Sequence, residues 1–342
     1  MNLFSTSSVR FTLGFVLSVA LSACMLLPQN REVRVQLLPL ANPFDAPELE
    51  YSALTWCGDT LLLIPQFPER YTVVDQPQFY TLSKTDILHA IHNPKAAPLR
   101  PAPIPLNEGA IRTIPAHFEG YEAAICSDTE VWLTIEGVNA QNQHQAWLVR
   151  GQRIVQGDVE SIELDDQSVV SMPSHSKMHN MSEEAILQIG QDIVSLHELN
   201  DPRLGTPSQA YRYSPNNNVL STLTFPNLAY RITDSTDVDE HGRFWVINYL
   251  YSGDDFSREA SDPVGAQYGI GKTHQTNYNV ERLVEFQFSG AGIRRVKRPP
   301  IQLKLEGLEG RNWEGIARLD DRGFLLITDR YPSTLFGFVP TR

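Results

Sequence analysis

Four acidic residues and one serine hold the same position in a pattern that recurs along the chain. They are Ser52, Glu122, Glu184, Asp234 and Glu314, and we call them the anchor residues. Carboxylates that converge on one point repel one another unless a cation or shared protons neutralise them. Oxygen ligands in flexible geometry suit Ca²⁺, and also Mg²⁺ that keeps some of its water. The pattern therefore predicts a divalent-metal site made by the four acids and Asn312, and Asp237 is near enough in sequence to contribute.

Instead of binding a metal, the same acids could have a structural role. A carboxylate at the start of a strand can accept hydrogen bonds from nearby backbone N–H groups, or pair with Arg231, Arg311 or Arg330. If a metal is bound, one carboxylate can activate water as a general base. We expect Glu314 or Glu184 to take that catalytic role.

A second polar set follows the first at a nearly constant distance. Each member lies 14 or 15 residues after an anchor, and we call the set the return residues: Gln66, Glu136, Glu198, Asn248 and Asp329. If each segment is a hairpin, the chain reverses and brings the return residue back to the end where its anchor lies. We therefore expect Glu136, Glu198, Asn248 and Asp329, together with Arg231, to bind substrate beside the metal.

Each anchor opens a segment of similar design. A short apolar strand, a polar turn and a strongly apolar second strand follow one another, as in SALTWCGDTLLLIPQ from Ser52 and EGIARLDDRGFLLITD from Glu314. Polar turns such as Gly58-Asp59 between apolar runs predict hairpins. A second strand that is apolar on both faces is buried on both faces. This is typical of the inner strands of a propeller blade.

These repeats predict an all-β fold, a β-propeller of five blades, with six as the alternative count. A more polar hairpin follows each of the first four segments, and the strand Ser333–Val339 would be completed by Glu32–Leu38 from the other end of the chain. Such pairing closes the ring and removes free edges. The whole of 24–342 would be one domain, with 252–279 as an insertion on one face. A β-sandwich or a tandem of small β-domains is the competing interpretation.

The N-terminus predicts export. The apolar run Phe11–Ala20 is too short to span a bilayer and suits a signal peptide. Leu-Ser-Ala-Cys at 21–24 resembles a bacterial lipobox, which implies removal of 1–23, a lipid on Cys24 and attachment to a membrane. Met25 in place of aspartate then favours the periplasmic face of the outer membrane or the cell surface. An ordinary signal peptide or an uncleaved membrane helix is the alternative.

The composition limits the classes of partner that we expect. The net charge is −12 and no basic run is present, so nucleic acid is excluded as an expected partner. Cys57 and Cys126 lie at nearly equivalent places of neighbouring repeats. An exported protein can join them in a disulfide, but we favour two buried free thiols because neighbouring strands need not meet the geometry of the bond. His274 in the insertion is a weak candidate for an acid or base.

Asn312-Trp313-Glu314-Gly315-Ile316-Ala317 and the repeats resemble the phytase-like propellers, also described as having esterase-like activity. The resemblance covers roughly 50–340 and implies a calcium-dependent propeller that hydrolyses carboxylic or phosphate esters. The first hypothesis is a metal-dependent hydrolase of a small ester, lactone or phosphoester. The alternative is a non-catalytic binding or scaffolding module, with the insertion and Tyr249, Tyr251, Tyr268 and Tyr278 as its contact surface.

Overall fold

The computed structural model describes residues 31–70, 72, 76–157, 159–174, 181–201, 207–254, 262–290, 292–307 and 309–341. Strands make up most of this part of the chain, which confirms the all-β prediction. The predicted signal peptide and Cys24 lie outside the described residues. Within them, no helix combines the length and the apolar character needed to cross a membrane.

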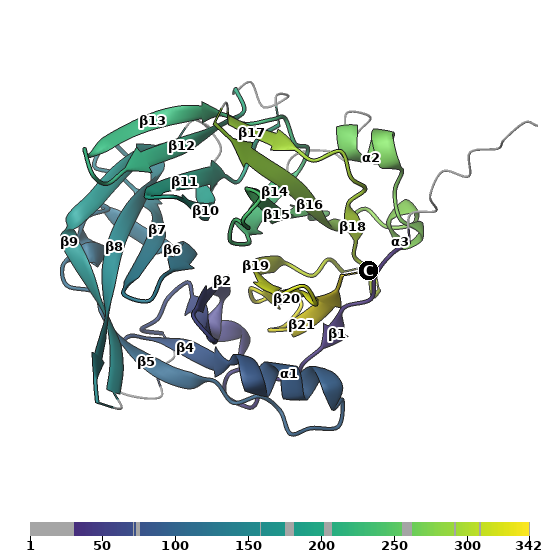
Figure 1. Cartoon of the computed structure of the whole chain (residues 1–342), viewed down its shortest axis with the longest axis horizontal. Coiled ribbons are helices and arrows are strands. Elements are labelled where there is room, and N and C mark those ends of the chain that lie inside the picture. The colour runs from purple at the N-terminus through teal and green to yellow at the C-terminus, as the bar shows by residue number, and fades with distance from the viewer. Residues whose placement is uncertain are drawn as a thin grey trace, which may run out of the picture.

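The described strands form antiparallel units of four (Figure 1). The first is β2 (Tyr51–Cys57), β3 (Thr60–Pro65), β4 (Gln78–Ser83) and β5 (Ala102–Asn107); the second is β6 (His117–Cys126), β7 (Glu130–Val138), β8 (His144–Gln156) and β9 (Val159–Pro173); the third is β10 (Glu183–Ile189), β11 (Asp192–His197), β12 (Gln209–Ser214) and β13 (Val219–Thr224). The fourth is β14 (Arg231–Ser235), β15 (Arg243–Leu250), β16 (Val280–Ser289) and β17 (Gly292–Arg295), with β18 (Ile301–Gln302) also on β16; the fifth is β19 (Trp313–Leu319), β20 (Gly323–Thr328), β21 (Phe336–Pro340) and β1 (Gln36–Leu37).

Each predicted hairpin forms the first two strands of one unit. Every residue of β20 is buried, as expected for a strand that is apolar on both faces. Gly58 turns between β2 and β3 with a φ of 65°, a conformation that glycine adopts without steric cost. The hairpins are thus specified locally, by turn chemistry and apolar strands.

The first strands of the units surround a common centre (Figure 1). They contact one another in succession: β2 with β6, β6 with β10, β10 with β14, β14 with β19, and β19 with β2. Apolar cores fill the spaces between neighbouring units. Pairs of buried residues that share one such core are Ile64 and Val131, Trp132 and Ile193, Val194 and Val246, Ile247 and Leu326, and Leu63 and Ile327. This arrangement of sheets is typical of a β-propeller.

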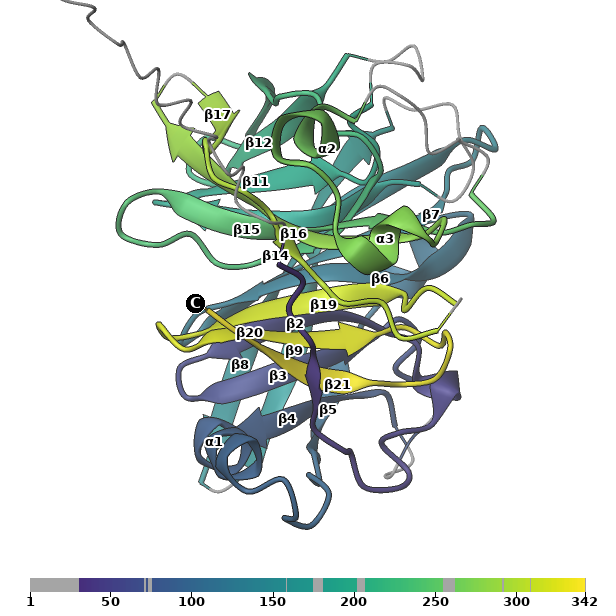
Figure 2. The ribbon, with the colours of Figure 1, turned by 90° about the vertical axis from the view of Figure 1, so that its right-hand side faces the viewer.

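The two ends of the described chain meet in one sheet. β1 pairs antiparallel with β21, so that Gln36 lies opposite Phe338 and Leu37 opposite Gly337 (Figure 2). The predicted pairing of the N-terminal segment with the last strand is therefore confirmed. One junction departs from the pattern, because β5 and β9 join the first two units through a short parallel pairing at Leu106 and Ile162.

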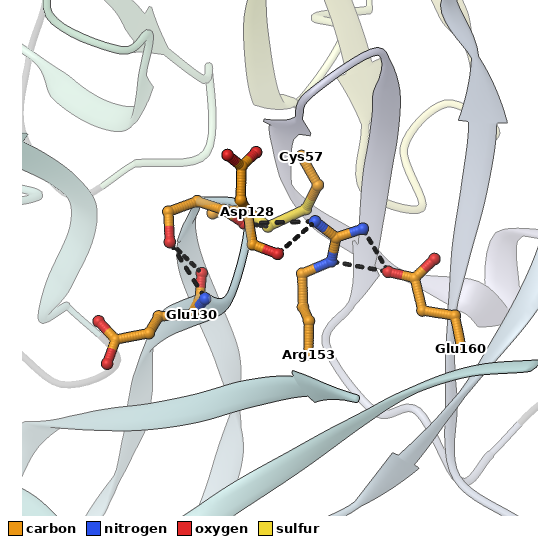
Figure 3. The surroundings of a disulfide bond; sticks show 7 residues. Cys57, Asp128, Glu130, Arg153 and Glu160 are labelled. Atoms are coloured by element: carbon orange, nitrogen blue, oxygen red, sulfur yellow. Dashed lines mark hydrogen bonds and ion pairs between the residues drawn. A yellow bond between two sulfur atoms is a disulfide. The ribbon is translucent and has the colours of Figure 1, made fainter. Parts of the chain in front are cut away.

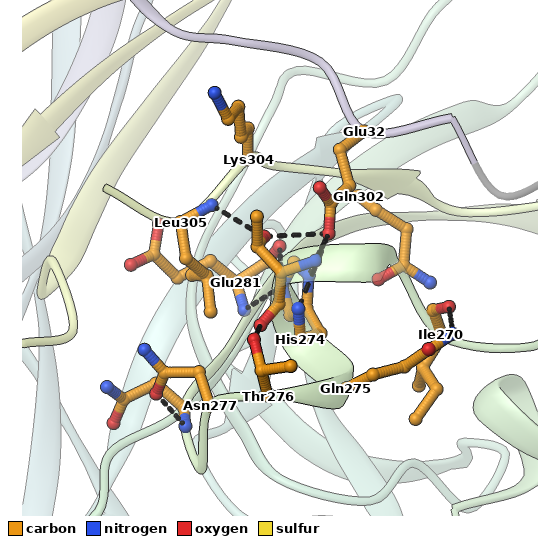
Figure 4. A network of polar contacts seen from close by, with 12 residues as sticks. Glu32, Ile270, His274, Gln275, Thr276, Asn277, Glu281, Gln302, Lys304 and Leu305 are labelled. Carbon is orange, nitrogen blue, oxygen red and sulfur yellow. Dashed lines mark hydrogen bonds and ion pairs between the residues drawn. The ribbon is translucent and has the colours of Figure 1, made fainter. Parts of the chain in front are cut away.

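The described parts of the predicted insertion contain no strand. They form α2 (Pro263–Tyr268) and α3 (Lys272–Gln275), whereas α1 (Lys84–His92) follows β4, and the 3-10 turns are η1 (Pro47–Leu49) and η2 (Ile111–Thr113). Glu32, which lies beside His274 in Figure 4, accepts hydrogen bonds from the backbone N–H and the hydroxyl of Thr273 at 2.6 and 2.7 Å. The ring of His274 lies 3.1 Å from both the Glu32 carboxylate and the Glu281 carbonyl, and is fully buried. His274 thus fixes the N-terminal segment to the insertion, and it does not line the central cavity described below.

The expectation of two free thiols is wrong. Cys57 and Cys126 form a disulfide, with their Cα atoms 5.2 Å apart (Figure 3). The two residues end β2 and β6, which contact each other directly, so the spacing between these units falls within the range that a disulfide requires. Beside the bond, Arg153 donates to the carbonyls of Ser127 and Asp128 and to the carboxylate of Glu160.

Replacing both cysteines by serine should lower the free energy of unfolding by about 2–5 kcal/mol. The bond closes a loop with a sequence separation of 69, and it restricts the unfolded chain accordingly. Denaturant unfolding of the oxidised protein and of Cys57→Ser/Cys126→Ser measures the difference. A reductant should bring the parent protein to the stability of the variant and leave the variant unchanged. Equal stabilities under oxidising conditions would contradict the prediction.

Candidate functional site

Every anchor residue lies at an irregularity of strand pairing. In three units the anchor is the one residue of the first strand that has no residue paired opposite it on the second strand. In the other two units it is one of two consecutive residues of this kind. These anchors are Ser52, Glu184 and Glu314, and then Glu122 and Asp234. A bulge bends its strand and redirects a side chain. The sequence repeat therefore marks a repeated bulge at the common centre of the units.

A cavity of about 650 Å³, which we call the central cavity, opens among these bulges. Six carboxylates line it, and the cationic side chain among its described lining residues is Arg231. The other polar or aromatic lining residues are Gln66, Asn312, Tyr249, Tyr251 and Tyr331. The acids are Glu122, Glu136, Glu184, Glu309, Glu314 and Asp329. The structure thus brings together three anchors, two acidic return residues, Asn312 and Arg231 from the predicted site.

Two anchors hold the fold together and do not line the cavity. Both oxygens of the buried Asp234 carboxylate accept backbone hydrogen bonds, from Ser235 and from Ile316 of the next unit, each at 2.7 Å. The Ser52 hydroxyl donates to the carbonyl of Tyr121 on β6 at 2.6 Å. The structure therefore supports a structural role for Asp234 in place of the predicted metal ligand, because backbone N–H groups already occupy its two oxygens.

Two return residues also differ from the prediction. Asn248 donates to the carbonyls of Ala229 and Arg231 at 2.8 and 3.0 Å and accepts from Arg282 at 2.8 Å. Glu198 is fully buried and pairs with Arg231. Neither lines the central cavity, so both lie behind it and position Arg231, which does.

Hydrogen bonds order part of the cavity wall. The Gln66 amide donates to Glu122 Oε1 at 2.8 Å, and the Asn312 amide donates to Glu314 Oε1. Among the described residues that line the cavity, two have a buried oxygen without a hydrogen-bond partner: Asn312, at Oδ1, and Glu136, at Oε1. Buried polar atoms of proteins normally have a partner, so the wall offers oxygen ligands that the described protein groups do not satisfy.

The environment opposes negative charge on these acids. Burial is the largest cause and raises the pKa of Glu122, Glu184 and Glu314 well above the usual range, and neighbouring carboxylates raise it further. Burial and Glu198 raise the pKa of Glu136 to about 8. Arg231 opposes the rise at Glu314 and Glu136. Without a further cation, the buried acids therefore retain protons near neutral pH.

Several lining residues were not predicted as site residues. Tyr331 follows the return residue Asp329 by two positions, and Tyr249 directly follows Asn248. The four tyrosines of the predicted contact surface do not all lie together. Tyr249 and Tyr251 line the cavity, whereas Tyr268 and Tyr278 do not. No repeat in the sequence marks Tyr331, since Pro68, Val138, Asn200 and Leu250 hold the equivalent positions after the other return residues.

A buried acid next to an anchor makes stability depend on pH. Burial raises the pKa of Glu183 to about 7, and the nearby Ser195 hydroxyl opposes the rise. An unfolded glutamate has a pKa of about 4.3. Its contribution to stability is therefore fully present below that pH and is lost as the pH rises to about 7, a total of about 4 kcal/mol.

We expect Glu183→Gln to remove this part of the pH dependence. Between pH 4.5 and 7 the variant should lose less stability than the parent protein, measured by denaturant unfolding at a series of pH values with chelator present. Glu240→Gln, a change of an exposed turn carboxylate, is the matched control. Parallel pH curves for the parent and Glu183→Gln would contradict the expectation.

Comparisons with known proteins find fold similarity alone. No protein-family model matches the sequence, and no curated protein matches it. Among solved structures, a soluble aldose sugar dehydrogenase from Escherichia coli is 12% identical, with coverage of 91% of this chain and 100% of that one and a TM-score of 0.46. A β-fructofuranosidase from Bombyx mori in complex with sucrose is 10% identical, with coverage of 91% and 62% and a TM-score of 0.47. An α-L-arabinanase from Cellvibrio cellulosa complexed with arabinohexaose is 8% identical, with coverage of 83% and 89% and a TM-score of 0.42.

Proposed function

We propose that this protein is a divalent-metal-dependent hydrolase that cleaves a small ester, lactone or phosphoester in the central cavity. One observation carries the proposal: Glu122, Glu184 and Glu314, from three different units, converge on one cavity in which each is too buried to hold its charge unaided. Perturbed carboxyls that line a cavity are typical of active sites. The phytase-like resemblance of the sequence agrees with this chemistry.

The architecture that we propose is a ring of five blades. The five antiparallel units, the cores between neighbouring units and the contact of β19 with β2 support this count. A ring brings one residue of each blade to a common axis. This is how residues that are far apart in sequence come to share the central cavity.

The donor set fits Ca²⁺, or Mg²⁺ that retains water, because it consists of carboxylate and amide oxygens. Glu122, Glu184, Glu314 and the unsatisfied Asn312 Oδ1 would hold the ion. When bound, it would polarise the scissile oxygen and favour the charged form of the acids. Glu314 or Glu184 would then accept a proton from the attacking water, and Arg231 would donate a hydrogen bond to a substrate oxygen.

Removal of divalent ions should lower both the rate of hydrolysis and the free energy of unfolding. We expect hydrolysis of p-nitrophenyl acetate and butyrate to fall at least tenfold in excess chelator and to return on addition of Ca²⁺. Ca²⁺ at 100 times its Kd should also raise the free energy of unfolding by about 2.7 kcal/mol. Activity that is absent with and without chelator, across ester, lactone and phosphoester probes, would sink the hydrolase proposal.

A binding module is the second candidate. Tyr251 and Tyr331 are 48% and 60% exposed while both line the cavity, and exposed aromatic side chains at a cavity mouth suit recognition. Simultaneous replacement of Glu122, Glu184 and Glu314 by glutamine separates the two ideas. Loss of activity with an intact fold favours the hydrolase. If the protein has no activity and the variant still captures a surface partner, the result favours the binding module.

We also propose that a lipid on Cys24 attaches the protein to a membrane on the exported side. The apolar run and the Leu-Ser-Ala-Cys sequence support this, with each buried methylene contributing about 0.8 kcal/mol. Incorporation of a labelled fatty acid into the parent protein, and its absence in Cys24→Ser, tests the attachment.

A further inference from the structure

A second group of metal-ligating side chains lies beside the central cavity. We propose that Glu119, Glu136 and His144 form a site for Zn²⁺ or a similar first-row divalent ion, separate from the hard-cation site of the anchors. One ligand atom of each residue lies within 4.8 Å of the corresponding atoms of the other two. The group is independent of the ester chemistry proposed above, since only Glu136 belongs to both surroundings.

Strand register explains how the three side chains meet. β6 and β7 pair with a shift between Phe118 and Gly120, so Glu119 is the skipped residue of a bulge, and Gly120 lies opposite Glu136. On the other side of β7, Val138 pairs with His144. Because Glu136 and Val138 are two residues apart, Glu136 and His144 occupy one face of the sheet as diagonal neighbours. Three adjacent strands thus present one ligand each.

The burial of the group points to an occupant. Glu136 is 1% exposed, and its Oε1 has no hydrogen-bond partner among the described residues. The side chains of Glu119 and His144 are 18% and 17% exposed, with Glu119 Oε2 and His144 Nδ1 3.0 Å apart. Two carboxylates therefore lie close together in a partly buried site, where the Ser182 hydroxyl and Arg231 act on Glu136. A bound divalent ion would offset this charge and satisfy the unpartnered oxygen.

The ligand types select the metal. Imidazole nitrogen suits Zn²⁺ and its first-row neighbours better than it suits Ca²⁺ or Mg²⁺. Three protein ligands leave a fourth position for water or an anionic group. The position is accessible from two sides, because Glu136 lines the central cavity and Glu119 lines an adjoining hollow of about 420 Å³ that also contains Arg70 and Arg330. An anion in that hollow could therefore reach the open position of the ion.

Titration of the chelator-treated full-length protein with Zn²⁺, in excess Ca²⁺, tests the site. We expect one Zn²⁺ per chain, and affinity at least tenfold weaker in Glu119→Gln and in His144→Gln, since even an outer partner of a metal ligand is worth 10–100-fold. His117→Gln is the matched control, because His117 lies on β6 and lines the adjoining hollow but is outside the group. Glu184→Gln controls for binding by the anchors. Both controls should keep the parent affinity.

A crystal of the Zn²⁺-loaded parent protein gives a readout that does not depend on the folding of any variant. Anomalous scattering at the zinc edge should place one peak among Glu119, Glu136 and His144. A peak elsewhere, no Zn²⁺ binding, or equal affinity in the parent and His144→Gln would each overturn the site. Loss of binding in Glu184→Gln alone would assign the ion to the anchors instead. None of these results depends on ester hydrolysis, so the two proposals fail separately.

Discussion

Glu314→Gln should lower kcat/KM for a model ester by about 10²–10⁴-fold, the usual contribution of a general base. Glutamine keeps the size of the side chain and can still bond Asn312, but it cannot accept a proton. The buried carboxyl is unfavourable in its charged form, because burial and Asp329 raise its pKa. The free energy of unfolding of the metal-free variant at pH 7 should therefore be equal to or higher than that of the parent.

This combination of lost activity and retained stability identifies a functional acid. Rates in saturating Ca²⁺ and unfolding in excess chelator measure the two parts. Glu184→Gln is the companion variant, and it shows which of the two acids is the base. Glu240→Gln, on the exposed turn of the fourth unit, should leave both quantities unchanged. If Glu314→Gln and Glu184→Gln both keep the parent rate, the catalytic assignment is wrong.

Arg231→Met should lower the free energy of unfolding by about 3–5 kcal/mol at pH 7, the cost of leaving one partner of a buried ion pair alone. Arg231 is 18% exposed at its side chain, and its partner Glu198 is fully buried. Burial disfavours the charge of Arg231, but Glu198 and the other carboxylates outweigh this and raise its pKa above the ordinary value. Removal of Arg231 leaves Glu198 unpaired among other acids.

A second change should restore most of the loss. In Arg231→Met/Glu198→Leu the pair is replaced by apolar side chains of similar size, so no buried charge is left uncompensated. Arg34→Met removes an exposed pair with Glu306 and should cost less than about 1 kcal/mol. Denaturant unfolding of the parent, of Arg231→Met and Glu198→Leu, and of the double variant gives the coupling energy. A loss below 1 kcal/mol in Arg231→Met would show that the pair does not stabilise the site.

The hairpins were predictable because their signals are local. Apolar strands, polar turns and the nearly constant spacing from Ser52 to Gln66 and its equivalents act within one unit. The pairing of the chain ends was predictable because the last repeat is followed by one strand where the others are followed by a hairpin. The sequence could not show which of several residues at the same repeat position line the cavity and which have a structural role. Asp234 and Glu184 hold the same place, yet one is bound by backbone N–H groups and the other lines the cavity.

Features that depend on distances between units were the ones missed. The Cys57–Cys126 bond requires two neighbouring units to approach closely at one end of their first strands. The meeting of Glu119 with His144 requires a bulge that no periodicity announces. Both arise from how sheets pack and bend, and neither has a signature in residue types alone.

The sheet that contains both ends of the described chain also constrains the order of assembly. Gln36 and Phe338 are about 300 positions apart, and their pairing is a contact of very long range. An emerging chain must therefore be released almost completely before its first strand can meet its last. Until then the free side of β21 is an unpaired edge, open to association with other chains. If Cys24 carries the proposed lipid, the membrane attachment precedes β1 in the chain. It would therefore be close in sequence to the β1–β21 pairing, the last to form.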